Sequence, residues 1–309
     1  MRIGTGGTGG TYFPIGSLIA SVISKPPGSR ECNVGGSCGV PGVIAAAVST
    51  QGSVENVRAL AEGNLDLALS QADVAYYAYF GENAFAGAPP IKELRTIANL
   101  YPEVVHLVAR PDANIRSVAD LKGKRVSLGE EASGTLVVAR VVLDSYGLSE
   151  RDVDARYDKL GKASDQLIAG ELDALFMVGG YPLGAVAHAA ETGKITLVPI
   201  SGPEADHLIE KRLFFTAAAI PAGIYSGVDK TPTVSVGAQL VVPATLGNEL
   251  VYQITQALWH PNNRQVLDSG HPDGARISLD TALDGIAIPL HPGAARYYKE
   301  IGLVSDDAF

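Results

Sequence analysis

The chain opens on residues 2–14, which read RIGTGGTGGTYFP, and this stretch decides the fold. Arg2-Ile3-Gly4 predicts a short strand, and a glycine-rich loop leads from it into a helix with Pro14 in the first turn. The helix is supported by apolar residues at helical spacing, namely Ile15, Leu18, Ile19 and Val22. A strand, a glycine loop and a helix in this order are typical of α/β proteins, in which the helix start attracts anionic groups.

Strands and helices continue to alternate along the chain. We expect strands over 44–48 and 65–69 with a helix between them. Later strands over 124–128 and 172–177 enclose two further expected helices, the first over 135–146. Such alternation predicts parallel sheets with right-handed crossovers, and ligands bind such sheets at the carboxyl ends of their strands.

Two segments of the chain repeat one pattern about a domain length apart. Residues 62–69 read EGNLDLAL and residues 169–176 read AGELDALF, each a helix end, a glycine, Leu-Asp and an apolar strand. The repeat predicts two lobes of the same architecture that face a shared cleft. With crossings near 104–108 and 213–220, the first lobe comprises residues 1–105 and 217–309, and the second comprises residues 106–216.

Composition excludes several classes of partner. The chain has 309 residues with 33 acidic and 24 basic side chains, a formal charge of −9. That balance argues against nucleic acid and against an anionic membrane surface, because both require a basic face. No apolar run approaches the roughly 18–20 residues of a membrane-spanning helix.

The two cysteines, Cys32 and Cys38, lie six residues apart in a glycine-rich stretch. We interpret them as a disulfide and hence infer an oxidising compartment, with two free cytosolic thiols as the alternative. A metal site is disfavoured because no second Cys or His pair completes it. No signal peptide is visible after Met1. A cytoplasmic chain and a mature secreted chain that restarts with methionine would both look like this.

Two short motifs suggest enzymes. Gly4, Gly6 and Gly9 match the dinucleotide-binding G-x-G-x-x-G pattern, but Glu31, the acid about 20 residues on, does not end an apolar strand. Residues 35–39, GGSCG, match the hydrolase pattern around Ser37 but lack the strand before it and the helix after it. An NAD(P)-binding enzyme and a serine hydrolase therefore remain as alternatives.

Small polar residues gather at the expected strand ends of both lobes. Hydroxyls, amides and glycine N–H groups suit a small polar or carboxylate ligand, and no catalytic set accompanies them. We therefore expect a binding protein that is not an enzyme, without metal or cofactor. For any single residue, ordinary capping is an equal explanation. The residues are Thr8, Thr11, Tyr12, Gln51, Ser53, Gln71, Ser133, Thr135, Gly180 and Tyr181.

Several motifs together resemble the TAXI-type solute receptors of TRAP transporters. They are residues 3–14, 35–42, 50–56, 70–76, 101–103, 220–223 and 289–294. The resemblance implies a two-lobed periplasmic binding protein-like fold of type II, with a mostly parallel sheet flanked by helices in each lobe and the ligand cleft between them. It implies a periplasmic receptor, with its signal peptide removed, that closes by a hinge on a small organic acid such as glutamate, 2-oxoglutarate or a similar dicarboxylate or amino acid. A sodium-coupled membrane subunit would receive the ligand.

The resemblance also implies a ligand set. Thr8, Thr11 and Tyr12 match the family's first ligand loop, Gln51 and Ser53 the second, and Gln71 the third. The second lobe contributes Ser133, Gly134 and Thr135 at a helix start, Gly180 and Tyr181 after a strand, and Tyr225. Phe13 stands where the family often has a second tyrosine, and residues 157–158 match no motif. No arginine lies in these loops, so the bidentate carboxylate clamp of other TRAP receptors is not evident. A cytoplasmic sensor with the same fold is a further alternative.

Overall fold

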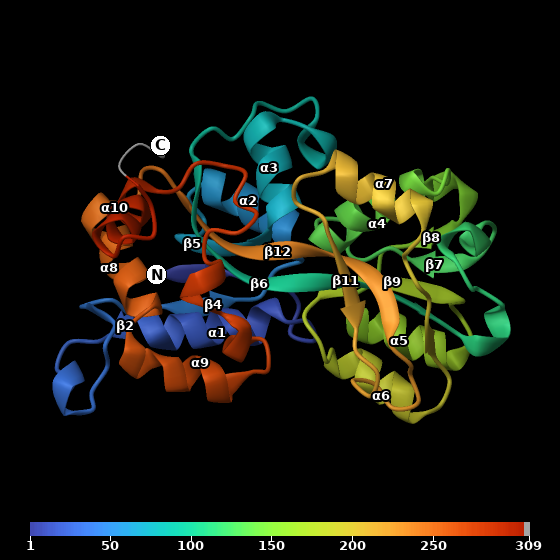
Figure 1. Cartoon of the computed structure of the whole chain (residues 1–309), viewed down its shortest axis with the longest axis horizontal. Helices are drawn as coiled ribbons and strands as arrows, with labels where there is room; N and C mark the ends of the chain where they lie inside the picture. Colours follow the sequence, from blue (N-terminus) through green and yellow to red (C-terminus); the bar gives the residue numbers. More distant parts are fainter. Residues whose placement is uncertain (306–309) are drawn as a thin grey trace. The chain divides into compact units, whose positions relative to one another are not determined.

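The computed structural model describes residues 1–305, and the chain divides into two compact units (Figure 1). The first unit contains Met1–Thr5, Tyr12–Tyr101 and the chain from Ala238 on. The second contains Gly6–Thr11 and Pro102–Gly237. The lobe boundaries that we inferred from the sequence remain a prediction, separate from this division into units.

The first unit is built on a sheet with β1 (Arg2–Gly4) at the centre of its three parallel strands. Two parallel neighbours flank β1, namely β4 (Ala46–Val48) and β5 (Leu67–Gln71). β12 (Thr231–Pro243) lies antiparallel to β5, and β6 (Leu94–Ala109) follows it in the sheet. These two long strands carry the chain into the second unit and back.

Helices cover both faces of this sheet. In Figure 1, α2 and α3 lie on one face, and α1 and α9 lie on the other. The helices are α1 (Tyr12–Ile23), α2 (Ser53–Ala61), α3 (Ala72–Phe80), α8 (Asn248–Leu258), α9 (Arg264–Gly270) and α10 (Pro292–Glu300). A separate parallel pair is formed by β2 (Ser24–Lys25) and β3 (Val40–Pro41).

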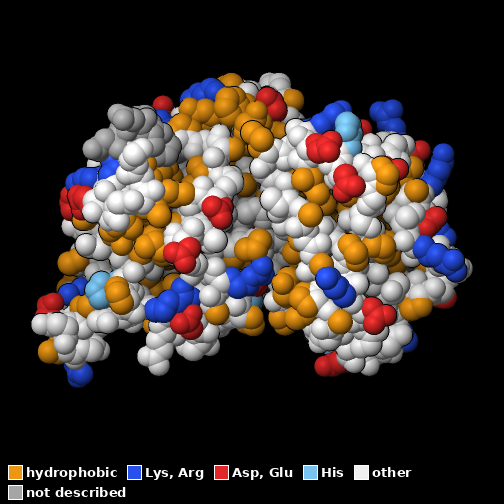
Figure 2. Space-filling view, in the orientation of Figure 1, with side chains coloured by type: hydrophobic (Ala, Val, Ile, Leu, Met, Phe, Trp, Pro, Cys, Tyr) orange, Lys and Arg blue, Asp and Glu red, His pale blue; other side chains and the backbone are white. Residues whose placement is uncertain are grey.

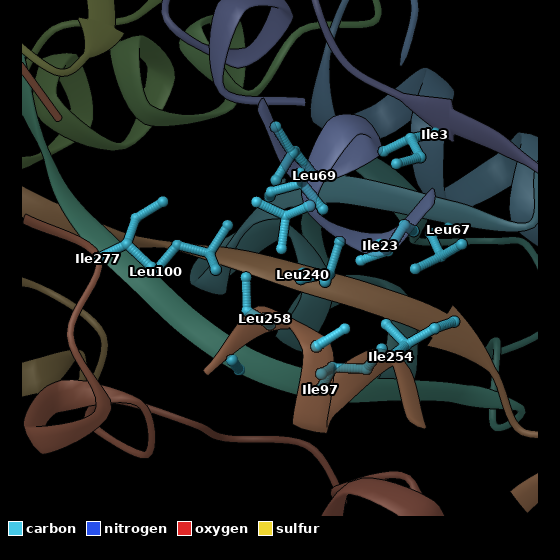
Figure 3. Close-up of a cluster of buried hydrophobic side chains, with 14 of the residues drawn as sticks. Ile3, Ile23, Leu67, Leu69, Ile97, Leu100, Leu240, Ile254, Leu258 and Ile277 are labelled. Atoms are coloured by element: carbon cyan, nitrogen blue, oxygen red, sulfur yellow. The ribbon is translucent and has the colours of Figure 1, made fainter. Parts of the chain in front are cut away.

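The core of the first unit joins distant parts of the chain (Figure 3). Ile3 and Leu69, from the N-terminal strands, share it with Leu240, Ile254 and Leu258 from the C-terminal segment. All five are at most 2% exposed. Since apolar burial is the main stabilising term, neither part of the chain completes this unit alone.

The second unit repeats the strand order of the first. β7 (Arg125–Ser127) lies between two parallel strands, β8 (Asp154–Arg156) and β9 (Ala174–Gly179). In both units the first strand lies between the second and the third. β6 is antiparallel to β9, β10 (Thr196–Leu197) to β6, and β11 (Thr216–Ile220) to β12. The expected parallel sheets are thus confirmed for three strands of each unit, and antiparallel strands extend both.

Four helices cover the sheet of the second unit. Figure 1 shows α4 and α7 on one face and α5 and α6 on the other. They are α4 (Gly134–Ser145), α5 (Leu160–Ala169), α6 (Gly184–Glu191) and α7 (Pro203–Lys211). Short 3₁₀ helices occupy Cys32–Val34, Asn83–Phe85, Pro111–Ala113, Val118–Leu121, Glu150–Asp152, Pro261–Asn263, Gly274–Arg276 and Leu279–Thr281. Within residues 1–305, no helix has the length and apolar character that crossing a bilayer requires.

The Leu-Asp repeat has a structural role that the two units share. Asp66 accepts the backbone N–H of Arg2 at 2.6 Å, and its own N–H donates to the Arg2 carbonyl at 3.0 Å. Asp173 makes the same two bonds with Arg125, both at 2.9 Å. Each aspartate therefore fastens the start of the unit's central strand. The Arg125 guanidinium, 2.7 Å from Asp173, also lowers the pKa of that carboxyl.

Candidate functional site

Three predicted residues of the first unit come together at the carboxyl end of β5. The Oγ of Ser53, the first residue of α2, accepts the backbone N–H of Gln71 at 3.1 Å. The hydroxyl of Tyr12 lies 3.5 Å from the same Oγ. All three side chains are buried, and we call them the Gln71 group.

The side chain of Gln71 carries a polar atom without a partner. Its Oε1 is buried and accepts no hydrogen bond from any residue between 1 and 305. The residue as a whole is only 3% exposed. Since a buried acceptor without a donor costs about 1–3 kcal/mol, this oxygen is suited to a donor from outside the chain.

Asn56, which the sequence analysis did not single out, holds the Gln71 group in place. Its Nδ2 donates to the carbonyls of Thr5, at 2.6 Å, and Leu69, at 2.8 Å. Its Oδ1 accepts the hydroxyl of Thr50 at 2.8 Å. One fully buried amide thus joins the ends of β1 and β5 to α2. The sequence signal that could have identified Asn56 is a polar residue on the buried face of a helix.

Other predicted residues lie at the edge of this group or belong to the second unit. Gln51 is exposed, and its backbone N–H donates to Glu55 at 2.8 Å. Thr8 is exposed, and it belongs with Thr11 to the second unit, whereas Tyr12 belongs to the first. The predicted first ligand loop is therefore divided between the units.

The second unit brings together three loops. The Oγ1 of Thr11 accepts the N–H of Gly180 at 3.1 Å, which joins the N-terminal glycine loop to the end of β9. The Oγ1 of Thr135 accepts the N–H of Val178 at 3.2 Å, which joins β9 to α4. Ser133 caps α4 by accepting the N–H of Leu136 at 3.1 Å. We call Thr11, Ser133, Thr135 and Gly180 the Thr135 group.

A glycine makes the close approach of these loops possible. Gly129 has φ +93°, a conformation that side chains rarely adopt. A Cβ there would come within 2.8 Å of Thr135 and 3.0 Å of the Ser133 Oγ. Only glycine therefore lets the loop after β7 close against the start of α4, where Gly134 is the first helical residue.

Tyr225 is fully buried, and its hydroxyl has two partners inside the second unit. The N–H of Leu183 donates to it at 2.9 Å, and the hydroxyl lies 2.9 Å from His106 Nε2. The His106 Nδ1–H then donates to the Val104 carbonyl at 3.2 Å. Burial lowers the pKa of His106 to about 4, which keeps it neutral and fit to accept. This chain anchors the loop that carries Tyr181, which is half-buried.

The two groups share one chemistry. Each lies at the start of a helix, α2 or α4, where free N–H groups and the helix dipole favour an anion. Neither contains an arginine or a paired carboxylate. Each group by itself offers an anionic group hydroxyls and backbone N–H groups, and the Gln71 group adds an amide.

The motifs that suggested enzymes have local structural roles. Glu31 pairs with Lys25 at 2.9 Å in an exposed loop, where it cannot act as the acid at the end of a second strand. The Ser37 hydroxyl donates to the Ser24 carbonyl at 2.5 Å, and no helix follows it. The predicted disulfide is confirmed, with Cys32 and Cys38 joined by an S–S bond of 1.97 Å.

The architecture is that of periplasmic solute-binding proteins, a mixed α/β fold in two units. A model of the NMT1-like family matches residues 3–302, and the chain belongs to that family.

Solved structures agree in fold. The chain is similar to PhnD1 from Prochlorococcus marinus (MIT 9301) in complex with methylphosphonate, at 11% identity and TM-score 0.57 over 98% of both chains. It is similar to the alkanesulfonate-binding protein SsuA from Xanthomonas axonopodis pv. citri bound to MOPS, at 17% identity and TM-score 0.52 over 97% of this chain and 83% of that one. An ancestral arginine-binding protein bound to arginine matches at 14% identity and TM-score 0.51, over 87% of this chain and 96% of that one. At these identities the likeness shows the fold alone, and it confirms the predicted fold class.

Proposed function

We propose that this protein is an extracytoplasmic solute-binding receptor that captures a small organic acid and delivers it to a membrane transporter. Family membership and the fold support a binding role, and the three solved relatives are named for small charged molecules that they hold. The Cys32–Cys38 disulfide supports an oxidising compartment such as the periplasm. The TAXI-like motifs favour the membrane subunit of a TRAP transporter as the partner.

One observation carries the proposal, namely the buried and unpartnered Oε1 of Gln71. It requires a donor, while the start of α2 beside it favours an anionic group. A molecule that offers both an anionic group and an N–H or O–H donor satisfies both. We therefore favour an amino acid such as glutamate over the matching 2-oxo acid, within the class of small organic acids.

The other predicted ligand residues enter this proposal in different roles. Ser53, Tyr12, Thr11, Ser133, Thr135 and Gly180 would orient backbone N–H groups and hydroxyls, with Gln51, Thr8, Gly134 and Tyr181 beside them. Tyr225 would act by anchoring the Tyr181 loop, because its hydroxyl bonds to Leu183 and His106. That one ligand bridges both lobes and closes a hinge stays a prediction from the sequence.

A thermal-shift panel tests the class of ligand. Amino acids, dicarboxylates and 2-oxo acids are compared with NAD(P) and nucleotides. A ligand at 100 times its dissociation constant stabilises by about 2.7 kcal/mol, which shifts the melting temperature by several degrees. A shift with one or two small acids supports the receptor. A shift with a dinucleotide alone would favour the NAD(P)-binding enzyme instead.

Calorimetric titration of the hit then tests the site. Gln71→Ala removes the acceptor and should weaken binding by about 1–3 kcal/mol. Gln256→Ala, an exposed glutamine on α8, is the matched control and should bind normally. Unchanged affinity in a folded Gln71→Ala protein would remove Gln71 from the site. Thr135→Val tests the second unit in the same way.

A further inference from the structure

A cavity of the second unit lies at the C-terminal ends of two helices. Its volume is about 430 Å³, which falls in the range of small-molecule sites. It is lined by residues 110–112 after β6, by residues 167–170 at the end of α5, and by residues 193–194 after α6. All of them belong to the second unit, where α5 and α6 cover the same face of the sheet (Figure 1).

The cavity lies apart from the Thr135 group. The backbone N–H of Arg110 donates to the Asp173 carbonyl at 3.0 Å, just before β9 begins at Ala174. The Thr135 group contacts the other end of β9, at Val178 and Gly180. At about 3.3 Å per residue, the length of this strand separates the two places by roughly 16 Å. The cavity is therefore not an extension of the Thr135 group.

A guanidinium on the wall of the cavity is held in one orientation. Arg110 donates from Nε to Asp112 Oδ1 at 2.8 Å and from Nη2 to Asp112 Oδ2 at 2.7 Å. Such a bidentate pair fixes the plane of the guanidinium. The third nitrogen, Nη1, donates to no residue between 1 and 305. Since the side chain is only 20% exposed, an acceptor bound to Nη1 would be shielded from much of the solvent.

Gly170 shows where this nitrogen lies. A Cβ at Gly170 would come within 2.6 Å of Arg110 Nη1. A glycine is common at the end of a helix, and Gly170 has the left-handed conformation, with φ +81°, that favours it. The close approach nevertheless places Nη1 directly against the end of α5, on the wall that Gly170 helps to form.

The cavity offers partners for both signs of charge. Arg110 and the exposed Lys194 are two cations against the one carboxylate of Asp112, and Lys194 forms no ion pair with any residue between 1 and 305. At the end of α5, the carbonyls of Ile168 and Ala169 accept no hydrogen bond from the same residues. The helix dipole makes this end partly negative. Figure 2 shows basic and acidic side chains interspersed on the visible face of the second unit, so no large field of one sign overrides these local charges.

We propose that this cavity is a second ligand site, which takes a zwitterionic amino acid with an aliphatic side chain. The carboxylate accepts from Arg110 Nη1 and from the Lys194 ammonium, while the amino group donates to the free carbonyls at the end of α5. The aliphatic side chain contacts Pro111 and Ile168. A carboxylate alone would leave the carbonyls without a donor, and an amine alone would leave both cations without an acceptor. None of these contacts involves the Gln71 group or the Thr135 group.

Isothermal titration with leucine tests the class of ligand. Isocaproate has the same carbon skeleton without the amino group, and isopentylamine has it without the carboxylate. We expect each of them to bind at least about tenfold more weakly than leucine, because each loses one set of charged hydrogen bonds. No binding of leucine at millimolar concentration, or equal affinity for leucine and isocaproate, would overturn the proposal.

Variants of the two cations test the contacts. Arg110→Gln should weaken leucine binding about tenfold, and Lys194→Gln about threefold because that side chain is exposed. Arg156→Gln is the matched control, since Arg156 also pairs with an aspartate two residues away, Asp154 at 2.8 Å, but lies outside the cavity. Melting curves show whether the variants are folded. If Arg110→Gln does not fold, Lys194→Gln still tests the site. Unchanged affinity in the folded variants would contradict the proposal.

Methyl NMR then separates this site from the one proposed for the transported solute. The δ1-methyl signal of Ile168 should shift when leucine is added, whereas that of Ile97, in the core of the first unit, should not. Leucine binding that leaves the Ile168 signal unmoved would place leucine elsewhere and overturn the second site. The response of Gln71→Ala to the solute found in the thermal-shift panel concerns the transported solute alone, so the two proposals can fail separately.

Discussion

The carbonyl oxygen of Val104 fixes the direction of a buried hydrogen-bond chain through His106 and Tyr225. Because this oxygen can only accept, Nδ1 of neutral His106 donates to it, and Nε2 accepts the Tyr225 hydroxyl, which also accepts the N–H of Leu183. A protonated His106 would place a charge in a fully buried position, which desolvation opposes. Burial therefore keeps His106 neutral in the folded protein.

This chain predicts a pH dependence of stability. Burial lowers the pKa of His106 from 6.5 to about 4. Between these values the unfolded chain binds a proton that the folded chain does not, so stability falls as the pH decreases. Between pH 7 and 4.5 the loss from this group is roughly 2–3 kcal/mol.

Urea denaturation at several pH values checks this, with His106→Gln as the comparison. The variant should show a flatter decline between pH 6.5 and 4, because its side chain does not titrate. Parallel declines in both proteins would assign the loss to the carboxyl groups instead.

Single residues were partly predictable from the sequence. Gln71 and Ser53 could be selected because they follow or begin elements that periodicity reveals, and strand ends bind ligands in α/β sheets. Asn56 and His106 could not, since the contacts that define them are tertiary and span up to 119 residues. A local pattern does not report the partner of a buried polar group.

At the scale of elements, the repeated Leu-Asp sequence corresponds to one strand order in both units. Asp66 and Asp173 each hold the first residue of the central strand through two backbone bonds. Asp173 also receives the Arg125 guanidinium through two bonds, at 2.7 and 3.1 Å. The Arg2 guanidinium is 4.0 Å from Asp66 and more exposed than that of Arg125.

We therefore expect Asp173→Asn to destabilise the protein by about 1–3 kcal/mol, and Asp66→Asn by less. Asp154→Asn, which disrupts an exposed pair with Arg156, should change stability by at most about 0.5 kcal/mol. Chemical denaturation of the three variants gives the order. An effect of Asp173→Asn no greater than that of Asp154→Asn would contradict the fastening role.

The lowered pKa of Asp173 also predicts how its contribution to stability depends on pH. Its contribution is present at neutral pH and is lost as the pH falls below 3.8, the ordinary value. Acid should therefore narrow the difference between wild type and Asp173→Asn.

The expected elements were found within a few residues because apolar periodicity marks them. The strand expected over 65–69 is Leu67–Gln71, and the helix expected over 135–146 is Gly134–Ser145. The pairing of β12 with β5 had no local signal, since it joins residues about 170 apart. The antiparallel pairing of the crossing strands was for that reason absent from the prediction.

At the scale of the molecule, the two units differ in how their cores are assembled. One core cluster of the second unit draws its residues from 104 to 225, a continuous stretch. The core of the first unit needs residues from both ends of the described chain. The units should therefore differ in their ability to fold as fragments.

We expect a fragment of residues 102–237 to fold, with α/β circular dichroism and a cooperative thermal transition. A fragment of residues 1–101 should stay unfolded, because it lacks Leu240, Ile254 and Leu258. Circular dichroism and calorimetry of both fragments check this. Cooperative unfolding of the N-terminal fragment would contradict the account of its core.

The unpartnered oxygen of Gln71 implies a trade-off between stability and function. Gln71 weakens the ligand-free protein, since an apolar residue of similar volume would leave no acceptor unpaired. Gln71→Met should accordingly melt at a higher temperature than the wild type without ligand, and at a lower temperature when both are saturated. Selection at this position would then have favoured ligand binding over the thermal stability of the ligand-free receptor.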